Sequence, residues 1–181
     1  MIIIGYPGIG KSTLAKKYDK TNIVNSRTYS ESFTKRLPRG IIDLESSLFK
    51  RTVDDRYWVP SYCRVATQLS DLGYVVFVSA HSDVQEELRK YIGDVVIIHP
   101  SIDLKQEWLE RLRQRYIESW TDDEKDKNLR AYSRACDCFE KDIASLKNNG
   151  FEIIEITSMD YDLENIVYNI EDILEGMEDL S

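Results

Sequence analysis

Short apolar runs rich in isoleucine and valine recur along the chain and alternate with longer amphipathic stretches. The runs lie at residues 1–4, 40–44, 74–78, 94–98 and 151–156. Most of them are uninterrupted, which is typical of strands that helices cover on both faces. The pattern therefore predicts an α/β domain of three layers, in which a mainly parallel sheet lies between two layers of helices.

The stretches between the runs repeat apolar residues at helical spacing. They predict helices over residues 62–72, 104–116, 122–149 and 162–174, of which the first is ended by Gly73 and the third by Gly150. Two polar or charged regions, residues 26–39 and 118–128, are interpreted as insertions on the core. A chain of 181 residues fits one domain with a sizeable core, so residues 1–181 are assigned to a single domain.

The first apolar run leads directly into the motif G-x-x-x-x-G-K-S at residues 5–12, and a helical pattern follows. A strand, a glycine loop and a helix N-terminus are the context that a Walker A loop requires. Glycines allow backbone N–H groups to surround phosphate oxygens, Lys11 can reach the β- and γ-phosphates, and Ser12 can ligate Mg²⁺. The residues expected to bind ATP are Gly5, Gly8, Ile9, Gly10, Lys11, Ser12 and Thr13.

Composition and charge narrow the range of partners. The formal net charge is −8 and acidic residues crowd the end of the chain, which does not favour nucleic acid as a partner. No apolar run approaches the roughly 20 residues of a membrane span. The three cysteines are odd in number, so no disulfide framework is expected. We expect a cytoplasmic protein that acts on a small molecule away from membranes, and the sequence leaves its oligomeric state open.

Two carboxylates, Asp43 and Glu45, straddle the carboxyl end of the second apolar run. This is the edge at which α/β sheets place their ligands. A carboxylate there could hold Mg²⁺ or accept a proton from an attacking hydroxyl, because phosphoryl transfer needs positioning and charge stabilisation. Asp43 is therefore a candidate catalytic residue and, with Ser12, a candidate metal ligand. The alternative is that Asp43 or Glu45 caps the following helix together with Ser46.

Arginines recur on two predicted helices around the charged region. Arg111 and Arg115 are four apart and share one helix face, as do Arg130 and Arg134, whereas Arg113 points elsewhere. Two helices that offer arginines inward would form a lid over phosphates, which we place at about residues 111–134. Arg111 and Arg115 are accordingly candidate catalytic residues. The alternative is a pair of solvated helix faces, because acidic residues are interspersed.

The order of these features resembles the nucleoside monophosphate kinase-like branch of the P-loop kinases over essentially the whole chain. Asp-Leu-Glu at residues 43–45 resembles the Asp-x-Asp of shikimate kinases. Val-Ser-Ala-His at residues 78–81, followed by Leu-Arg at 88–89, resembles a segment of gluconate kinases. The resemblance implies a P-loop NTPase fold with strand order 2-3-1-4-5, a helical lid, ATP and Mg²⁺ as cofactors, and an adenine site near residues 157–161.

The third strand departs from the common pattern because no carboxylate follows it, so Mg²⁺ would depend on Ser12, the phosphates and Asp43. The acceptor is expected within about residues 26–70, where arginines and aromatics could hold a base with a phosphate or polar sugar. The residues expected to contact it are Glu45, Trp58, Tyr62, Arg64 and His81, with Arg27, Arg36, Arg39, Arg51, Arg56 and Tyr57 nearby. An ordinary amphipathic helix would explain Trp58 equally well.

Three functions fit these residues. We favour ATP-dependent phosphoryl transfer to a nucleoside monophosphate or related nucleotide, because arginines outnumber other polar types around the expected acceptor site. The first alternative is a kinase of a hydroxyl group, on a shikimate- or gluconate-like metabolite, a nucleoside or a modified base, with Asp43 as the base. The second alternative is a nucleotide-binding protein without transfer activity, which the missing Walker B carboxylate would explain.

Overall fold

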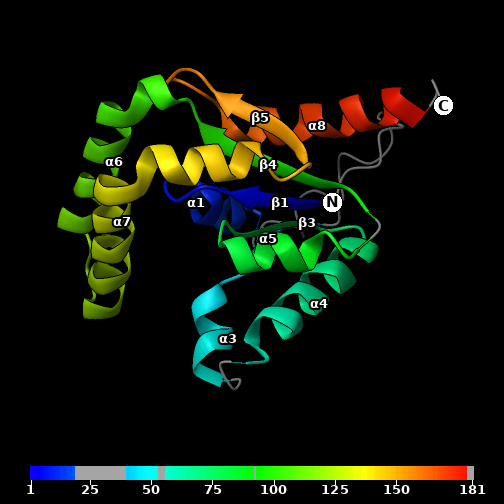
Figure 1. The fold of residues 1–181 in the computed structure, drawn as a ribbon, viewed down its shortest axis with the longest axis horizontal. Coiled ribbons are helices and arrows are strands. Elements are labelled where there is room, and N and C mark those ends of the chain that lie inside the picture. The colour runs from blue at the N-terminus through cyan, green and yellow to red at the C-terminus, as the bar shows by residue number, and fades with distance from the viewer. Residues whose placement is uncertain (19–39, 53–55, 92, 179–181) are drawn as a thin grey trace.

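Five parallel strands form one sheet at the centre of the computed structural model, which describes residues 1–18, 40–52, 56–91 and 93–178 (Figure 1). The strand order is β2-β3-β1-β4-β5, and all neighbours run parallel. The strands are β1 Ile2–Gly5, β2 Ile41–Asp43, β3 Val75–Ser79, β4 Val95–Pro100 and β5 Glu152–Ile156. The five apolar runs of the sequence and the expected strand order are thereby confirmed.

The burial of each strand explains its sequence. The inner strands β1, β3 and β4 are buried along almost their whole length, which is why they are uninterrupted Val/Ile runs. The edge strand β5 exposes Glu152 and Glu155 and turns Ile156 into the core. The two glutamates in its sequence therefore reflect its more exposed place at the edge of the sheet.

Helices cover both faces of the sheet, with α4, α5 and α7 on one face and α1 and α8 on the other (Figure 1). The helices are α1 Lys11–Lys17, α3 Ser46–Thr52, α4 Trp58–Asp71, α5 Ser82–Leu88, α6 Lys105–Ile117, α7 Asp122–Lys147 and α8 Leu163–Glu178, with a 3₁₀ turn, η2, at Ile102–Leu104. Within the described residues, no helix has the length and apolar character needed to cross a membrane.

The structure describes only part of the regions interpreted as insertions or as the acceptor site. Residues 26–39 lie outside the described residues, and the rest of the acceptor stretch, from residue 41 to 70, supplies β2, α3 and α4. Most of the charged region at residues 118–128 is the beginning of α7. The hydroxyl of Thr121 accepts a hydrogen bond from the backbone N–H of Glu124, and the acidic residues of the first turn suit the positive end of the helix dipole.

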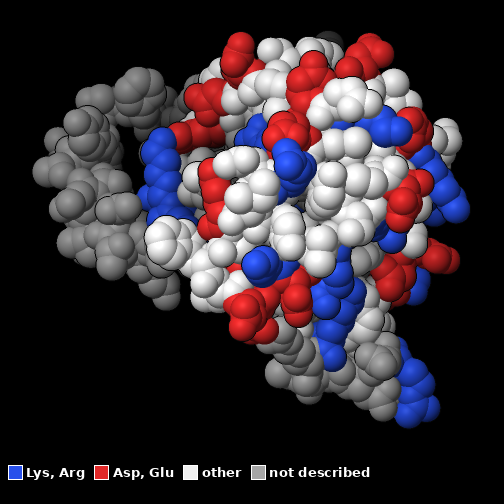
Figure 2. All heavy atoms as spheres, turned by 90° about the vertical axis from the view of Figure 1, so that its left-hand side faces the viewer, with Lys and Arg blue, Asp and Glu red and all other residues white. Residues whose placement is uncertain are grey.

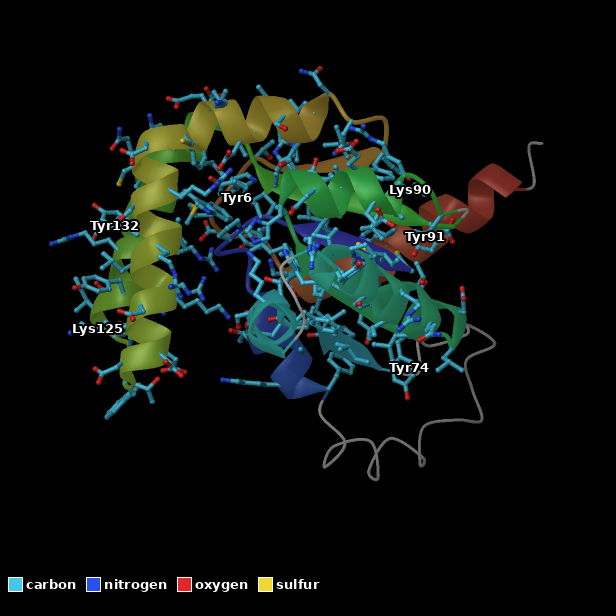
Figure 3. All side chains as sticks on the ribbon, turned by 60° about the horizontal axis from the view of Figure 1, so that its bottom comes forward. Tyr6, Tyr74, Lys90, Tyr91, Lys125 and Tyr132 are labelled. Carbon is cyan, nitrogen blue, oxygen red and sulfur yellow. The ribbon has the colours of Figure 1, made fainter. Side chains whose placement is uncertain are left out.

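The carboxyl ends of the strands face the hairpin formed by α6 and α7, which projects from one side of the sheet (Figure 1). On this side of the molecule, basic and acidic side chains are interspersed, so the described residues show no continuous basic face there (Figure 2). Lys125 and Tyr132 point outward from the hairpin, whereas Tyr6 at the end of β1 lies on its inner side (Figure 3). The sheet edge and the inner side of the hairpin therefore enclose the candidate site.

Candidate active site

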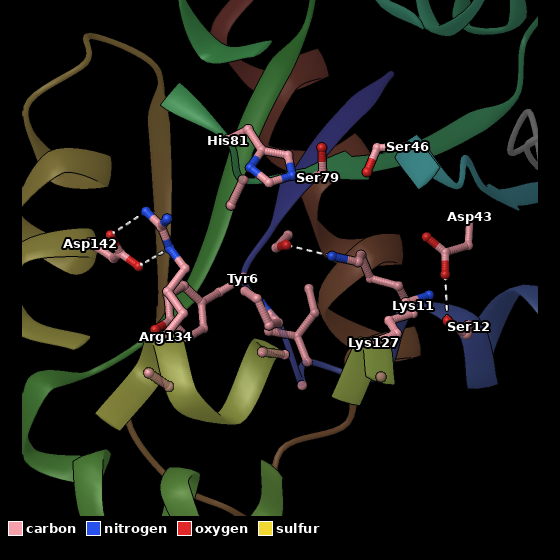
Figure 4. Close-up of a pocket in the computed structure, with 18 of the residues that line it drawn as sticks. Tyr6, Lys11, Ser12, Asp43, Ser46, Ser79, His81, Lys127, Arg134 and Asp142 are labelled. Atoms are coloured by element: carbon pink, nitrogen blue, oxygen red, sulfur yellow. Dashed lines mark hydrogen bonds and ion pairs between the residues drawn. The ribbon is translucent and has the colours of Figure 1, made fainter. Parts of the chain in front are cut away.

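A cavity of about 430 Å³ lies at the carboxyl edge of the sheet (Figure 4). It is lined by the loop after β1, the ends of β2 and β3, the start of α5, and the inner faces of α6 and α7. The structure brings to it every residue expected to bind ATP and every residue expected to be catalytic, namely Gly5, Gly8, Ile9, Gly10, Lys11, Ser12, Thr13, Asp43, Arg111 and Arg115. Residues from three distant parts of the sequence therefore share one cavity.

The glycine loop has the conformation that its sequence predicts. Gly8 and Gly10 have φ angles of 93° and 98°, in the left-handed region that favours glycine. A Cβ atom on Gly8 would also lie 3.1 Å from Nε1 of Trp108 and 3.1 Å from Cδ2 of Leu112. Gly8 therefore permits both the turn of the loop and its close packing against α6.

The side chains of Trp108 and Tyr161 contact the outer side of the glycine loop. The sequence did not predict these contacts. Nε1 of Trp108 donates a hydrogen bond to the carbonyl oxygen of Pro7, and the hydroxyl of Tyr161 donates one to the carbonyl oxygen of Ile9, each at 2.9 Å. The two rings stack with centroids 6.1 Å apart, and the guanidinium of Arg111 lies over both. Because these donors bind loop carbonyl groups from outside, they stabilise the shape of the loop.

The hydrogen bond from the Tyr161 hydroxyl to the loop leads to a prediction about ATP affinity. Tyr161→Phe keeps the stacked ring but removes the hydrogen bond to Ile9, so the affinity for ATP should fall by about 2- to 10-fold. Calorimetric titration with ATP·Mg²⁺ measures this change. Tyr168→Phe is the matched control, because the Tyr168 hydroxyl bonds to that of Tyr18 between α1 and α8. Equal ATP affinity in wild type and Tyr161→Phe would contradict a role of this hydroxyl in loop geometry.

The side chain of Lys11 folds back onto the glycine loop. Its Nζ atom donates a hydrogen bond to the carbonyl oxygen of Gly5 at 2.5 Å. Burial lowers the pKa of Lys11 to about 8, and the nearby carboxylate of Asp43 offsets part of that effect. The ammonium of Lys11 is desolvated and lines the cavity, so it is well placed to bind a phosphate group that enters it.

Asp43 contacts the first turn of α1. The hydroxyl of Ser12 donates a hydrogen bond to Oδ2 of Asp43 at 2.5 Å, which brings the two expected metal ligands into contact. No cluster of three or more metal-binding side chains occurs in the described part of the chain. A cation at Ser12 and Asp43 would therefore need phosphate oxygens to complete its coordination, as Mg²⁺ commonly does.

Glu45 forms an ion pair across the cavity with Lys127 of α7, a residue that sequence analysis did not single out. Burial works to raise the pKa of Glu45, but the contacts with Lys127 and Ser47 outweigh it and hold the pKa below its usual value. The glutamate is therefore ionised at neutral pH.

The acceptor residues expected on α4 do not line the cavity. Tyr62 is fully buried, where its hydroxyl donates to the carbonyl oxygen of Leu44 at 2.7 Å and accepts from the backbone N–H of Ser79 at 2.9 Å. Trp58 is buried beside Tyr62, and Arg64 is exposed. These corrections have one cause: the apolar face of α4 turns towards the sheet, so its aromatics belong to the core.

His81 does line the cavity, at the N-terminus of α5. Its Nε2 atom accepts a hydrogen bond from Nζ of Lys50 at 3.2 Å, and its ring packs edge-on against Trp58. Burial and the charge of Lys50 lower the pKa of His81. The ring is therefore neutral at pH 7. Arg56 and Tyr57 are exposed, the side chain of Arg51 is not described, and Arg27, Arg36 and Arg39 lie outside the described residues.

Several polar residues of the cavity were not predicted. Ser79 ends β3 at the position where a Walker B carboxylate is common, and its buried hydroxyl has no hydrogen-bond partner in the described residues. Arg134 forms a two-point ion pair with Asp142, with N···O distances of 2.8 Å (Figure 4). The sequence indicates only the helix face of Arg134, and no local pattern marks Asp142 as its partner.

The parallel sheet, its strand order and the glycine loop before α1 define a P-loop NTPase α/β fold. Among solved structures, the chain is similar to the crystal structure of shikimate kinase from Bacteroides thetaiotaomicron, with 16% sequence identity and a TM-score of 0.50. The match covers 96% of this chain and 97% of the other. At this identity the likeness shows the fold alone. No protein-family model and no curated protein sequence matches the chain.

Proposed function

We propose that this protein is an ATP-dependent kinase that phosphorylates a hydroxyl group of a small molecule. The observation that carries the proposal is the contact of Asp43 with Ser12, because it places a carboxylate at the glycine loop, across the cavity from Arg134 and Asp142 (Figure 4). A carboxylate there suits a hydroxyl acceptor, whose proton must be removed during transfer. The similarity in fold to a shikimate kinase is compatible with this proposal.

The residues of the loop and of α6 would bind the donor. Lys11 would exchange the carbonyl oxygen of Gly5 for phosphate oxygens, and the backbone N–H groups of the loop would surround them. Arg111 and Arg115 line the same cavity and make no ion pair within the described residues, so their charges are available to the phosphates. These groups offset the charge that develops during transfer.

Asp43 would act on the acceptor. As the acceptor oxygen bonds to the γ-phosphorus, the bond from that phosphorus to the bridging oxygen breaks, ADP leaves, and the hydroxyl proton passes to Asp43. Ser12 and Asp43 would help to hold the Mg²⁺ that binds with ATP, and that ion would offset the negative charge of the phosphates. The donor set fits this ion, because Ser12 and Asp43 offer oxygen atoms and the unpartnered hydroxyl of Ser79 could bind a water molecule of its shell.

The pairing of charges favours a hydroxyl acceptor over a nucleoside monophosphate. The two-point ion pair with Asp142 neutralises Arg134, so this arginine is not free to bind a second phosphate group. A nucleoside monophosphate kinase stays a second candidate, which Arg115 favours because its guanidinium lines the cavity and forms no ion pair within the described part of the chain. A nucleotide-binding protein without transfer activity is a third, which Ser79 favours because it replaces a carboxylate.

One assay separates these candidates. Purified protein is incubated with ATP·Mg²⁺ or GTP·Mg²⁺ and a panel of nucleoside monophosphates, nucleosides, sugar acids, shikimate and other polyols, and the products are followed by ³¹P NMR. A phosphate monoester supports the proposal, whereas a new phosphoanhydride supports the second candidate. Binding of ATP without any transfer supports the third.

The lowered pKa of Lys11 gives a prediction about pH. Phosphate binding requires the charged lysine, so at pH 8 binding of ATP should take up about half a proton, and the uptake should be much smaller at pH 6.5. Since the free protein loses this charge above pH 8, ATP affinity should fall as the pH rises towards 9. Calorimetry in buffers of different ionisation enthalpy measures both. Identical proton uptake at pH 6.5 and pH 8 would show that Lys11 is fully charged in the free protein.

A further inference from the structure

We infer that Lys127 is a phosphate-binding residue that Glu45 holds in the nucleotide-free protein, and that it exchanges Glu45 for the γ-phosphate when ATP binds. This inference rests on the proposed function. It adds a residue that neither the Walker A motif nor the arginine pattern of the sequence indicates. It also assigns Glu45 a role that is separate from that of Asp43.

The position of Lys127 supports the first half of the inference. It lies in α7, lines the same cavity as Lys11 and Asp43, and is drawn on their side of that cavity (Figure 4). Its charge also acts on Lys11, whose pKa it lowers together with burial, the larger effect. Lys11, Arg115 and Lys127 are thus three cations that converge on one end of the cavity. Cations converge in this way where a polyanion is bound.

The partner of Lys127 supports the second half. The ion pair with Glu45 links α7 to the end of β2 across 82 residues of sequence, and both side chains remain partly exposed. An exposed ion pair between flexible side chains contributes little to stability, so it can be replaced at low cost. The ammonium of lysine is a mobile point charge with three donors, which suits transfer from a carboxylate to a phosphate.

The exchange would have a consequence on the acceptor side. While Lys127 holds Glu45, the glutamate is neutralised and its oxygen is occupied. Once Lys127 turns to the phosphate, the carboxylate of Glu45 becomes free at the end of β2, beside Asp43 and Ser46. Glu45 can then accept a hydrogen bond from a hydroxyl of the acceptor. Binding of the donor would thereby complete the acceptor site.

The test is a set of calorimetric titrations with ATP·Mg²⁺ and ADP·Mg²⁺. Lys127→Ala and Lys127→Gln should each weaken ATP binding about tenfold and ADP binding much less, because the contact is to the γ-phosphate. The matched control is Lys125→Ala, since Lys125 lies on the outer side of the same helix turn, near the ring of Tyr116 (Figure 3). That variant should bind both nucleotides as wild type does. A melting temperature for each variant confirms that it is folded.

Glu45→Gln tests the exchange itself. It should strengthen ATP binding several-fold by releasing Lys127, and this gain should disappear in the double variant with Lys127→Ala. An equal gain in both backgrounds would overturn the exchange, because it would reflect only the removal of a negative charge. Equal ATP affinity in wild type and both Lys127 variants would overturn the inference and leave the proposed function intact. A wild-type protein that binds no ATP would instead refute the proposed function.

Discussion

Replacing Lys11 with alanine should reduce phosphoryl transfer by at least about 10²- to 10³-fold, the loss seen when one preorganised charge-stabilising donor is removed. The physical reason is that Lys11 is the cation of the glycine loop itself, and no other residue at positions 5–13 can supply a positive side chain to the β- and γ-phosphates. The measurement is kcat with the acceptor that the panel identifies.

The same substitution should not destabilise the fold. The folded-state pKa of Lys11, about 8, lies below its unfolded value, so below pH 8 the buried ammonium opposes folding. Thermal unfolding at pH 7 should therefore give an equal or higher melting temperature for Lys11→Ala. Lys16→Ala, on the exposed side of the same helix, is the control and should keep wild-type activity. Wild-type turnover by folded Lys11→Ala would refute the assignment of the loop.

Asp43→Asn should lower kcat by about 10²- to 10⁴-fold if the acceptor is a hydroxyl, because a general base of this kind contributes that much. Asparagine has the size of aspartate and can still accept the hydrogen bond from Ser12, so the loop geometry should survive. The dissociation constant of ATP should accordingly change little. Steady-state kinetics and calorimetry on the same preparation measure the two quantities.

A phosphate acceptor predicts a different result for the same variant. The oxygen of a phosphate is already anionic near neutral pH and needs no base, so Asp43→Asn would act mainly through the placement of Mg²⁺. The loss of kcat would then be smaller, and excess Mg²⁺ would partly restore it. Asp71→Asn, at the exposed end of α4, controls for the loss of one negative charge. A loss of less than tenfold that excess Mg²⁺ reverses would overturn the proposed hydroxyl acceptor.

The sequence predicted features that depend on neighbouring residues. An uninterrupted apolar run at residues 2–4 must be covered on both faces, whichever helices cover it, and this requirement led to the parallel sheet. The glycines before Lys11 specify a tight loop with positive φ at Gly8 and Gly10, and Gly73 and Gly150 mark turns with positive φ after helices. The spacing of apolar residues and the need for a positive φ at a glycine are local properties, so one sequence is enough to detect them.

The candidate site depended in part on residues that only the fold brings together. Trp108 and Tyr161 support the glycine loop from α6 and from the segment after β5, and Lys127 reaches Glu45 across the cavity. No local pattern marks such partners, because their contacts follow from the path of the chain through space.

The same limit explains why the prediction that Tyr62 of α4 contacts the acceptor was wrong. Tyr62 and its neighbours have the composition of a binding site, but the rotation of α4 turns them towards the sheet. Residue type and spacing thus determined the fold and the conformation of the glycine loop of this protein. Tertiary packing alone decided which polar groups face the cavity and which carboxylate neutralises each cation, because both depend on the direction of side chains from elements far apart in sequence.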